Sequence, residues 1–276
     1  MTALAPRAAA ARPAPARRPF LPLVRADLLK LRRNRGLLAA AAAMTIGPVL
    51  VAYTTLVILH AANPAHHGPA GGIANLGKGM GLLAMIGSVA AVLAGASAGA
   101  GDLSSGVFRE LVVTGRSRVA LFASRIPGGL AFLLPLVAVA SALTAGATVI
   151  FAGSLSAPST TLLAEAGIWV TVQIAFYFVL ALGLASLIGS RAQTIGILLA
   201  WQLAVTPILL SIGVLGAGRD AIPDAAFVRL GPHVLDEYVR RGPVVSMSAA
   251  VALAVIALWT SVAVALGMWR TAKRDA

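Results

Sequence analysis

Six long apolar stretches divide the chain, and short polar segments separate them. The stretches cover residues 37–60, 80–101, 126–152, 166–190, 192–215 and 244–269. Each stretch reaches the roughly 20 residues that a membrane-spanning helix needs, and none of the six contains Asp, Glu, Lys or Arg. A transmembrane β-barrel would instead show alternating segments of about 10 residues. The pattern therefore predicts an all-α integral membrane protein with six transmembrane helices.

The segment before the first apolar stretch has two parts. Residues 1–22 are rich in Ala, Pro and Arg, contain no acidic residue and lack the apolar core of a secretory signal. They predict a disordered cytoplasmic tail, with a cleaved transit sequence as the alternative, ahead of a single transmembrane domain over 23–276. Residues 23–35 predict a basic amphipathic helix in the membrane interface. Its apolar face consists of Val24, Leu28 and Leu31.

Composition and charge agree with a membrane protein and give it an orientation. Hydrophobic residues make up 59% of the chain and charged residues 11%, whereas soluble domains carry about 25% charged residues. Although a net charge of +13 could indicate nucleic acid, the basic residues lie between the spans, where they orient a membrane protein. Seventeen of the 22 Lys and Arg residues fall on one predicted side and five on the other. We therefore expect a plasma-membrane protein with both termini in the cytoplasm and no nucleic-acid partner.

One polar segment, residues 102–118, combines basic and apolar residues between the second and third spans. Helical spacing relates Val107, Leu111 and Thr114, and also Phe108, Leu111 and Val112, which predicts a short amphipathic helix between Gly106 and Gly115. Arg109, Arg116, Arg118 and Arg125 make the segment basic. Two interpretations follow: a cytoplasmic loop that fixes topology, or a helix that binds a soluble partner.

The longest outer loop, residues 216–243, contains a second candidate helix. Pro232 could open it, and Asp236 with Arg240 and Glu237 with Arg241 are acid-before-base pairs at helical spacing. Both a short amphipathic helix on the outer leaflet and a solvated loop fit this pattern.

A few polar side chains fall within the fourth and fifth spans. Gln173, Tyr177 and Gln202 either form hydrogen bonds between helices or line a substrate path. Because the six spans carry no charged residue that could relay an ion or proton, the sequence argues against a secondary carrier.

Three further patterns match known motifs without their structural context. The 72–79 segment reads G-x-x-x-x-G-K, but Gly79 replaces the Ser or Thr that a phosphate-binding loop needs for Mg²⁺. The 95–99 segment reads G-x-S-x-G inside an apolar helix, where small residues favour close helix packing over a nucleophilic serine. The histidines, at positions 60, 66, 67 and 233, lack the spacing of metal ligands, and with no Cys we expect no metal site.

The order of these elements resembles the type 2 family of ABC (ATP-binding cassette) transporter permeases. In that family a segment of the form E-x-x-x-G-T, followed by a basic apolar helix that ends near Ser-Arg, links spans two and three. Here Asp102 replaces the Glu and Val107 replaces the Thr, while Gly106, Ser117 and Arg118 match. The resemblance covers about residues 23–270. It implies that 23–35 is an elbow helix and that about 103–114 is a coupling helix.

The resemblance also implies a function and partners. The chain would be a membrane-spanning permease subunit without enzyme activity or cofactor, exporting a hydrophobic or amphipathic substrate. A separate ATPase subunit would hydrolyse ATP, and a second permease copy, identical or different, would complete the transporter. The residues implied to contact the ATPase are Asp102, Gly106, Phe108, Arg109, Glu110, Leu111, Val112, Arg116 and Arg118. The alternatives are a membrane-embedded structural or assembly protein and a secondary carrier.

Overall fold

The computed structural model describes residues 20–104, 106–113, 115–232 and 247–273, and every regular element in them is a helix. Six of these helices, or runs of helix, are long and apolar enough to cross a membrane. The chain is therefore an all-α, multi-pass membrane protein, as the hydrophobic pattern predicts.

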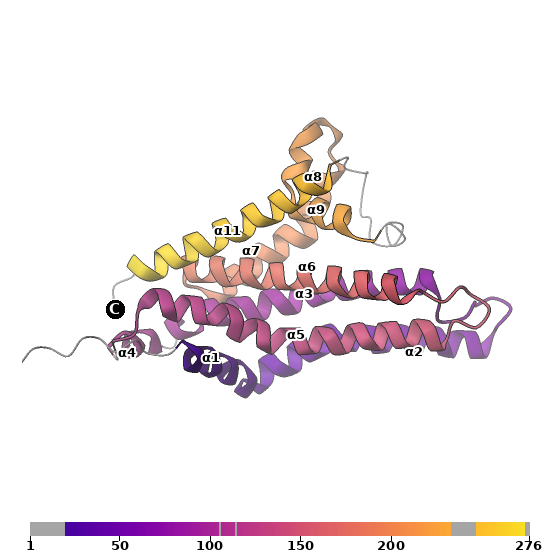
Figure 1. The fold of residues 1–276 in the computed structure, drawn as a ribbon, viewed down its shortest axis with the longest axis horizontal. Helices are drawn as coiled ribbons and strands as arrows, with labels where there is room; N and C mark the ends of the chain where they lie inside the picture. Colours follow the sequence, from indigo (N-terminus) through magenta and orange to yellow (C-terminus); the bar gives the residue numbers. More distant parts are fainter. Residues whose placement is uncertain (1–19, 105, 114, 233–246, 274–276) are drawn as a thin grey trace, which may run out of the picture.

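The helices are numbered along the chain as in Figure 1. The elements are α1 (Leu21–Arg33), α2 (Arg35–Ala62), α3 (Ile73–Ser104), α4 (Val107–Val113), α5 (Arg118–Ile150), α6 (Thr160–Ile188), α7 (Arg191–Ala200), the π turn η1 (Trp201–Val205), α8 (Thr206–Ser211), the 3₁₀ segment η2 (Gly213–Ala221), α9 (Pro223–Leu230) and α11 (Ala249–Lys273). The run from α7 through η1 to α8 forms one span.

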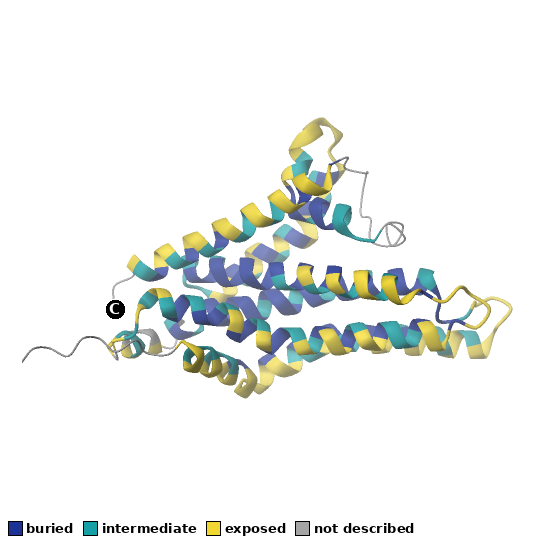
Figure 2. Ribbon diagram, in the orientation of Figure 1, coloured by how far each residue is buried: buried dark blue, intermediate teal, exposed yellow. Residues whose placement is uncertain are grey.

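The long helices α2, α3, α5 and α6 run side by side along the molecule (Figure 1). The short helices α1 and α4 and the C-terminal end of α11 lie at one end of this bundle, here named the α4 end. The α2–α3 and α5–α6 connections lie at the opposite end. Helices α3 and α6 have the largest share of buried residues among the spans, whereas α2 and α11 have the smallest (Figure 2).

Small residues let α3 and α6 approach each other closely at the centre. A Cβ atom on Gly95 would lie 2.3 Å from the carbonyl oxygen of Phe178, and one on Gly99 would lie 2.5 Å from that of Leu182. Ser97, between them, donates its hydroxyl proton to the carbonyl of Leu93 at 2.6 Å. The structure confirms the prediction that the G-x-S-x-G segment serves helix packing.

Several helices begin before the apolar stretches that predict them, and the longest extensions are those of α3 and α5. The 73–79 segment forms the first turns of α3, so the G-x-x-x-x-G-K pattern is helical from Ile73 and Lys78 is an exposed helical residue. Helix α5 begins at Arg118, where the Ser117 side chain accepts a hydrogen bond from the amide of Ala120. Such a capped start is common for helices, and it adds eight residues, two of them Arg, to the predicted third span.

Helix α1 packs on the bundle through the face that the sequence assigned to the membrane interface. Leu31 is buried, and Val24 and Leu28 are half-buried. A Cβ atom on Gly128 of α5 would lie 2.8 Å from the Cβ of Asp27, so α1 and α5 are in close contact. The expectation of an apolar face resting on lipid is therefore corrected to one resting largely on α5.

The two ends of the bundle provide a direct test of topology. Glu110 is exposed at the α4 end and Gly68 is exposed in the α2–α3 connection. In this cysteine-free chain, Glu110→Cys and Gly68→Cys should react with an impermeant thiol reagent from opposite sides of the membrane, with only Gly68→Cys labelled in intact cells. Labelling of Glu110→Cys alone in intact cells would reverse the orientation expected from the Lys and Arg distribution.

Candidate functional site

The first candidate site is α4, a seven-residue helix between two spanning helices. Gly106 and Gly115 flank it with φ angles of +75° and +76°, a backbone region that glycine adopts without strain. Val113 is 80% exposed and Val107 is 38% exposed. Leu111 and Val112 are half-buried. The helix therefore presents apolar side chains at the α4 end of the bundle.

The residues implied to contact a partner have different environments. Gly106 and Glu110 are exposed, and Arg116 is half-buried. Phe108 and Arg109 belong to α4, but their side chains lie outside the described part of the structure. The remaining two, Asp102 and Arg118, bind other elements of this chain.

Asp102 is the centre of a buried charge cluster that joins three helices. The residue is only 5% exposed, and its carboxylate accepts a hydrogen bond from Arg125 Nη2 of α5 at 2.8 Å and another from Lys30 Nζ of α1. Arg125 also donates to the carbonyl of Gly99 at 3.1 Å. Asp102 is thus part of the bundle interior and holds the segment that leads into α4; it is not on the surface that a partner would contact.

Two further interactions hold the α4 end together. Arg118 Nη1 donates to the carbonyl of Ala272 at 3.2 Å, which joins the start of α5 to the end of α11. Ser124 donates to the Asp27 carboxylate at 2.6 Å. Burial raises the pKa of Asp27 above its ordinary value, while the Ser124 hydrogen bond acts in the opposite direction.

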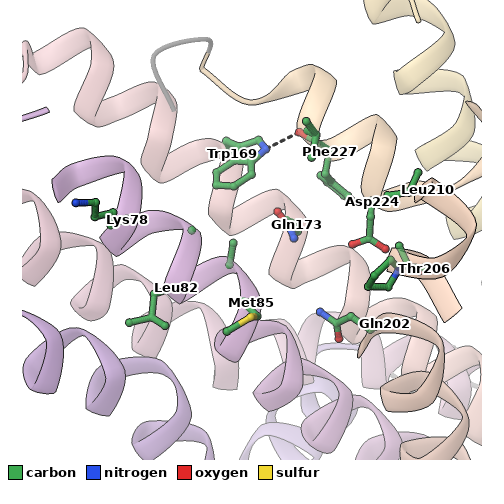
Figure 3. A pocket seen from close by; sticks show the side chains of 14 residues that line it. Lys78, Leu82, Met85, Trp169, Gln173, Gln202, Thr206, Leu210, Asp224 and Phe227 are labelled. Atoms are coloured by element: carbon green, nitrogen blue, oxygen red, sulfur yellow. Dashed lines mark hydrogen bonds between the residues drawn. The ribbon is translucent and has the colours of Figure 1, made fainter. Parts of the chain in front are cut away.

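The second candidate site is a polar cavity of about 290 Å³ toward the opposite end (Figure 3). Its polar lining comes from Lys78 of α3, Gln173 of α6, Gln202 of η1, Thr206 of α8 and Asp224 of α9. Among the described residues, Gln173 Oε1, Gln202 Oε1 and Thr206 Oγ1 are buried without a hydrogen-bond partner. A buried polar atom without a partner costs roughly 1–3 kcal/mol, so these atoms mark a place where a ligand or water would bind.

Gln202 lies in the π turn η1. Pro207 has no amide hydrogen for the usual helical bond, and just before it the amide of Thr206 donates to the carbonyl of Trp201, five residues back. Gln202 Nε2 then donates to the Ser88 hydroxyl of α3. Ser88 donates its own proton to the carbonyl of Met85 at 2.6 Å. By contrast, α2 and α5 continue as helices through Pro48 and Pro135.

Helix α9 closes this cavity, and the sequence did not indicate it. Trp169 Nε1 donates to the carbonyl of Phe227 at 2.8 Å (Figure 3), and Trp259 Nε1 donates to that of Ala221 at 3.0 Å. Tyr177 donates its hydroxyl proton to Asp224 Oδ1 at 2.7 Å. An acidic residue from outside the six apolar stretches therefore contacts a transmembrane helix, although the stretches themselves contain no charged residue.

A signal for α9 was present in the sequence. Proline at a first helical position followed by an acidic residue is a typical helix start, and Pro223 with Asp224 has this form nine residues before Pro232. The helix expected from Pro232, with its Asp236–Arg240 and Glu237–Arg241 pairs, lies outside the described residues apart from Pro232 itself.

An apolar cavity of about 220 Å³ lies next to the polar one. Its lining comes from α6, α7, η1, α9 and α11 and includes Tyr177, Trp201, Pro223 and Trp259. Tyr177 and Pro223 therefore border the apolar cavity, while Asp224, the hydrogen-bond partner of Tyr177, borders the polar cavity. The two cavities are neighbours on either side of this contact.

The histidines do not gather at either cavity. His66 and His67 are exposed and His60 is half-buried near the α2–α3 connection, where His60 Nδ1 donates to the carbonyl of His67 at 2.6 Å. His233 lies outside the described residues. Within the described part of the chain, no group of three His, Asp or Glu residues could hold a metal ion.

Comparison with known proteins does not assign the chain to a family. No protein-family model matches it, and no curated protein matches it at a significant level.

Proposed function

We propose that this chain is the membrane-spanning permease subunit of an ABC transporter that exports an amphipathic substrate and is driven by a separate ATPase subunit. The observation that carries the proposal is α4, a short helix with exposed apolar side chains between two spanning helices. Val113, at its end, is 80% exposed. An apolar patch of this kind is typical of a binding surface for another protein. In this proposal the α4 end faces the cytoplasm, where ATP is available.

The charge cluster supports a mechanical role for α4. A partner that moves α4 would pull on α3 and α5, which Asp102 and Arg125 join at 2.8 Å. Lys30 also binds Asp102 and so joins α1 to the same unit. Arg118 connects this unit to α11. These helices would then move as rigid bodies between inward and outward access, with the ATP chemistry confined to the partner.

The polar cavity is the proposed place of substrate binding. Gln173 and Gln202 line it directly, whereas Tyr177 reaches it through Asp224. The working unit would contain two permease copies and two ATPases. Exposed apolar residues on α2 and α11, among them Val51 and Leu258, would contact lipid or the second copy in the plasma membrane.

A secondary carrier is the second candidate function, and one observation favours it. Asp224 and Lys78 both line the cavity, and ionisable groups at such positions often serve ion or proton coupling. A carrier would transport its substrate without an ATPase. Transport by the purified chain in vesicles without ATP would favour this second function over the first.

The α4 proposal predicts a position-specific loss of ATPase binding. Val113→Asp places a charge in the proposed contact surface, and burying an unpaired charge is costly. We expect the affinity for the ATPase to fall about 30-fold or more, equivalent to about 2 kcal/mol. Phe108→Ala with Arg109→Glu should act in the same direction. The measurements are ATP hydrolysis that co-purifies with the tagged chain from its native membrane, and export by the same cells.

Val214→Asp is the matched control, because Val214 is 98% exposed and lies in η2, outside the α4 end. It should leave ATPase co-purification unchanged, and all variants should reach the membrane in equal amounts. If Val113→Asp and the Phe108/Arg109 double variant retain normal ATPase binding and export, α4 is a topology-setting connection and the permease assignment fails.

A further inference from the structure

Neutral polar groups from three elements meet at the polar cavity. Gln173 of α6, Gln202 of η1 and Thr206 of α8 line it and are 8%, 6% and 3% exposed. Their side-chain oxygens are buried without a hydrogen-bond partner among the described residues. In Figure 3, Lys78 lies on the far side of the cavity from Gln202 and Thr206. A single ligand in this cavity would therefore have several buried groups to bind.

The Thr206 hydroxyl is an exception to a pattern seen elsewhere in the described helices. Other threonine hydroxyls donate to the carbonyl four residues back, at 2.7–2.9 Å; they are those of Thr45, Thr144, Thr171, Thr194, Thr260 and Thr271. Thr206 lacks this bond. It follows the π turn, where its amide donates to the carbonyl of Trp201, five residues back. The hydroxyl proton of Thr206 is therefore available to a ligand.

The amide of Gln202 has a defined orientation. Ser88 donates its hydroxyl proton to the carbonyl of Met85 at 2.6 Å, so it accepts from Gln202 Nε2. The Gln202 amide oxygen is thus left as an acceptor without a donor. With the Gln173 oxygen and the Thr206 hydroxyl, the cavity presents two acceptors and one donor. A primary carboxamide carries the complementary set of two N–H donors and one carbonyl acceptor.

The rest of the lining favours a neutral ligand with an apolar remainder. Lys78 and Asp224 also line the cavity, but each already interacts with another group of the protein. A charged ligand would therefore be buried without a counter-charge reserved for it, which is costly. Much of the remaining lining is apolar and includes Met85, Trp169 and Phe227.

We infer that the polar cavity binds a small neutral molecule with a primary-carboxamide head. Its N–H groups donate to the amide oxygens of Gln173 and Gln202, and its carbonyl accepts from the Thr206 hydroxyl. The cavity volume of about 290 Å³ is close to the lower limit of roughly 300 Å³ for small-molecule sites, so the ligand is small. This inference names the substrate class for the proposed function and rests on it, although binding itself requires no ATPase.

The test is equilibrium dialysis of isotope-labelled ligands against the full chain in lipid nanodiscs, without an ATPase. The probes are hexanamide, pentyl methyl ketone and hexanoate, which share a pentyl tail. The ketone replaces the amide NH₂ with a methyl group of similar size, so it keeps the acceptor and loses both donors, whereas hexanoate is charged. Empty nanodiscs give the contribution from lipid partitioning. Hexanamide should bind saturably and about tenfold or more tightly than either other probe.

Two substitutions separate ligand binding from a structural role. Thr206→Val keeps the shape and removes a hydroxyl that has no partner among the described residues, so the thermal midpoint should stay the same or rise. The dissociation constant for hexanamide should nevertheless rise about two- to tenfold. Gln173→Met removes one acceptor at nearly constant volume and should raise that constant by a similar factor.

Thr194→Val is the matched control in the same span. The Thr194 hydroxyl donates to the carbonyl of Ser190 at 2.8 Å, and Thr194 is not among the residues that line the cavity. This variant should leave hexanamide binding unchanged and lower the thermal midpoint slightly, since a buried hydrogen bond is lost. Thr206→Val and Thr194→Val should therefore have opposite effects on binding and stability.

Three results would overturn the inference: no saturable binding of hexanamide, which would leave water as the occupant of the cavity; equal binding of the ketone or of hexanoate; or unchanged binding in Thr206→Val or Gln173→Met. The comparison of probes uses the unsubstituted chain, so it does not depend on the folding of a variant. Because these measurements contain no ATPase, their failure with intact ATPase binding at α4 would remove the substrate class alone. Failure at α4 with intact hexanamide binding would remove the ABC assignment alone.

Discussion

Arg125→Leu is expected to destabilise the folded chain by about 3–5 kcal/mol, because it leaves the buried Asp102 carboxylate without the guanidinium that pairs with it. The side chains of Arg125 and Asp102 are 2% and 7% exposed. Solvent cannot replace the lost contact at such burial. The measurement is equilibrium unfolding of the purified chain in mixed micelles, with circular dichroism at increasing denaturing detergent.

The same cluster contains its own control. Lys30 also binds Asp102, but its side chain is 42% exposed, and exposed ion pairs contribute only about 0–1 kcal/mol. Lys30→Ala should therefore have a small effect. The double variant Asp102→Leu, Arg125→Leu should recover part of the loss, since it removes both charges. If Lys30→Ala and Arg125→Leu destabilise equally, the cluster is not dominated by the buried pair.

Gly95→Ala and Gly99→Ala form the second large prediction. A single added methyl group would meet backbone atoms of α6 at 2.3 and 2.5 Å, and backbone cannot rotate away as a side chain can. Overpacking of this kind costs about 1–3 kcal/mol and occasionally more. We expect each variant to lower the midpoint of thermal unfolding in detergent and the two together to separate α3 from α6.

Gly146→Ala is the matched control, because a Cβ atom there would meet nothing within 4 Å. Alanine has the higher helix propensity, so this variant should be neutral or slightly stabilising. A thermal midpoint for Gly95→Ala equal to that of Gly146→Ala would show that α3 and α6 can separate without cost, contrary to the packing described above.

Hydrophobicity predicted the spans because lipid imposes the same requirement on every spanning helix. It did not predict their ends, for a physical reason. Arg118 and Arg125 belong to α5, yet they interrupt an apolar pattern and read as loop residues. They are stable in a helix because Ala272 and Asp102 receive their hydrogen bonds. Those partners are more than 20 residues away along the chain, and no local pattern contains them.

The sequence predicted those parts of the candidate sites that depend on local features and missed those that depend on contacts between distant parts of the chain. The glycines around α4 and its apolar residues are local features, so the sequence indicated that helix. Gln173 and Gln202 stood out because amides are rare in apolar spans, and the cavity does bring them together. Asp224 was missed, since its role depends on α9 folding back onto Trp169 and Tyr177. Tertiary contact decides that position, and the sequence pattern around it fits a solvent-exposed loop equally well.

The π turn has a consequence for changes in chain length. Each residue of an α-helix turns the chain by about 100°. In η1 the amide of Thr206 bonds to the carbonyl of Trp201, five residues back instead of four, so the turn holds one extra residue. Deleting one residue from Trp201–Val205 would restore regular α-helix locally while rotating α8 relative to α7. Thr206 and Leu210 would then leave the cavity although neither had been substituted. An insertion or deletion at this turn would therefore change which side chains face the cavity without substituting any of them.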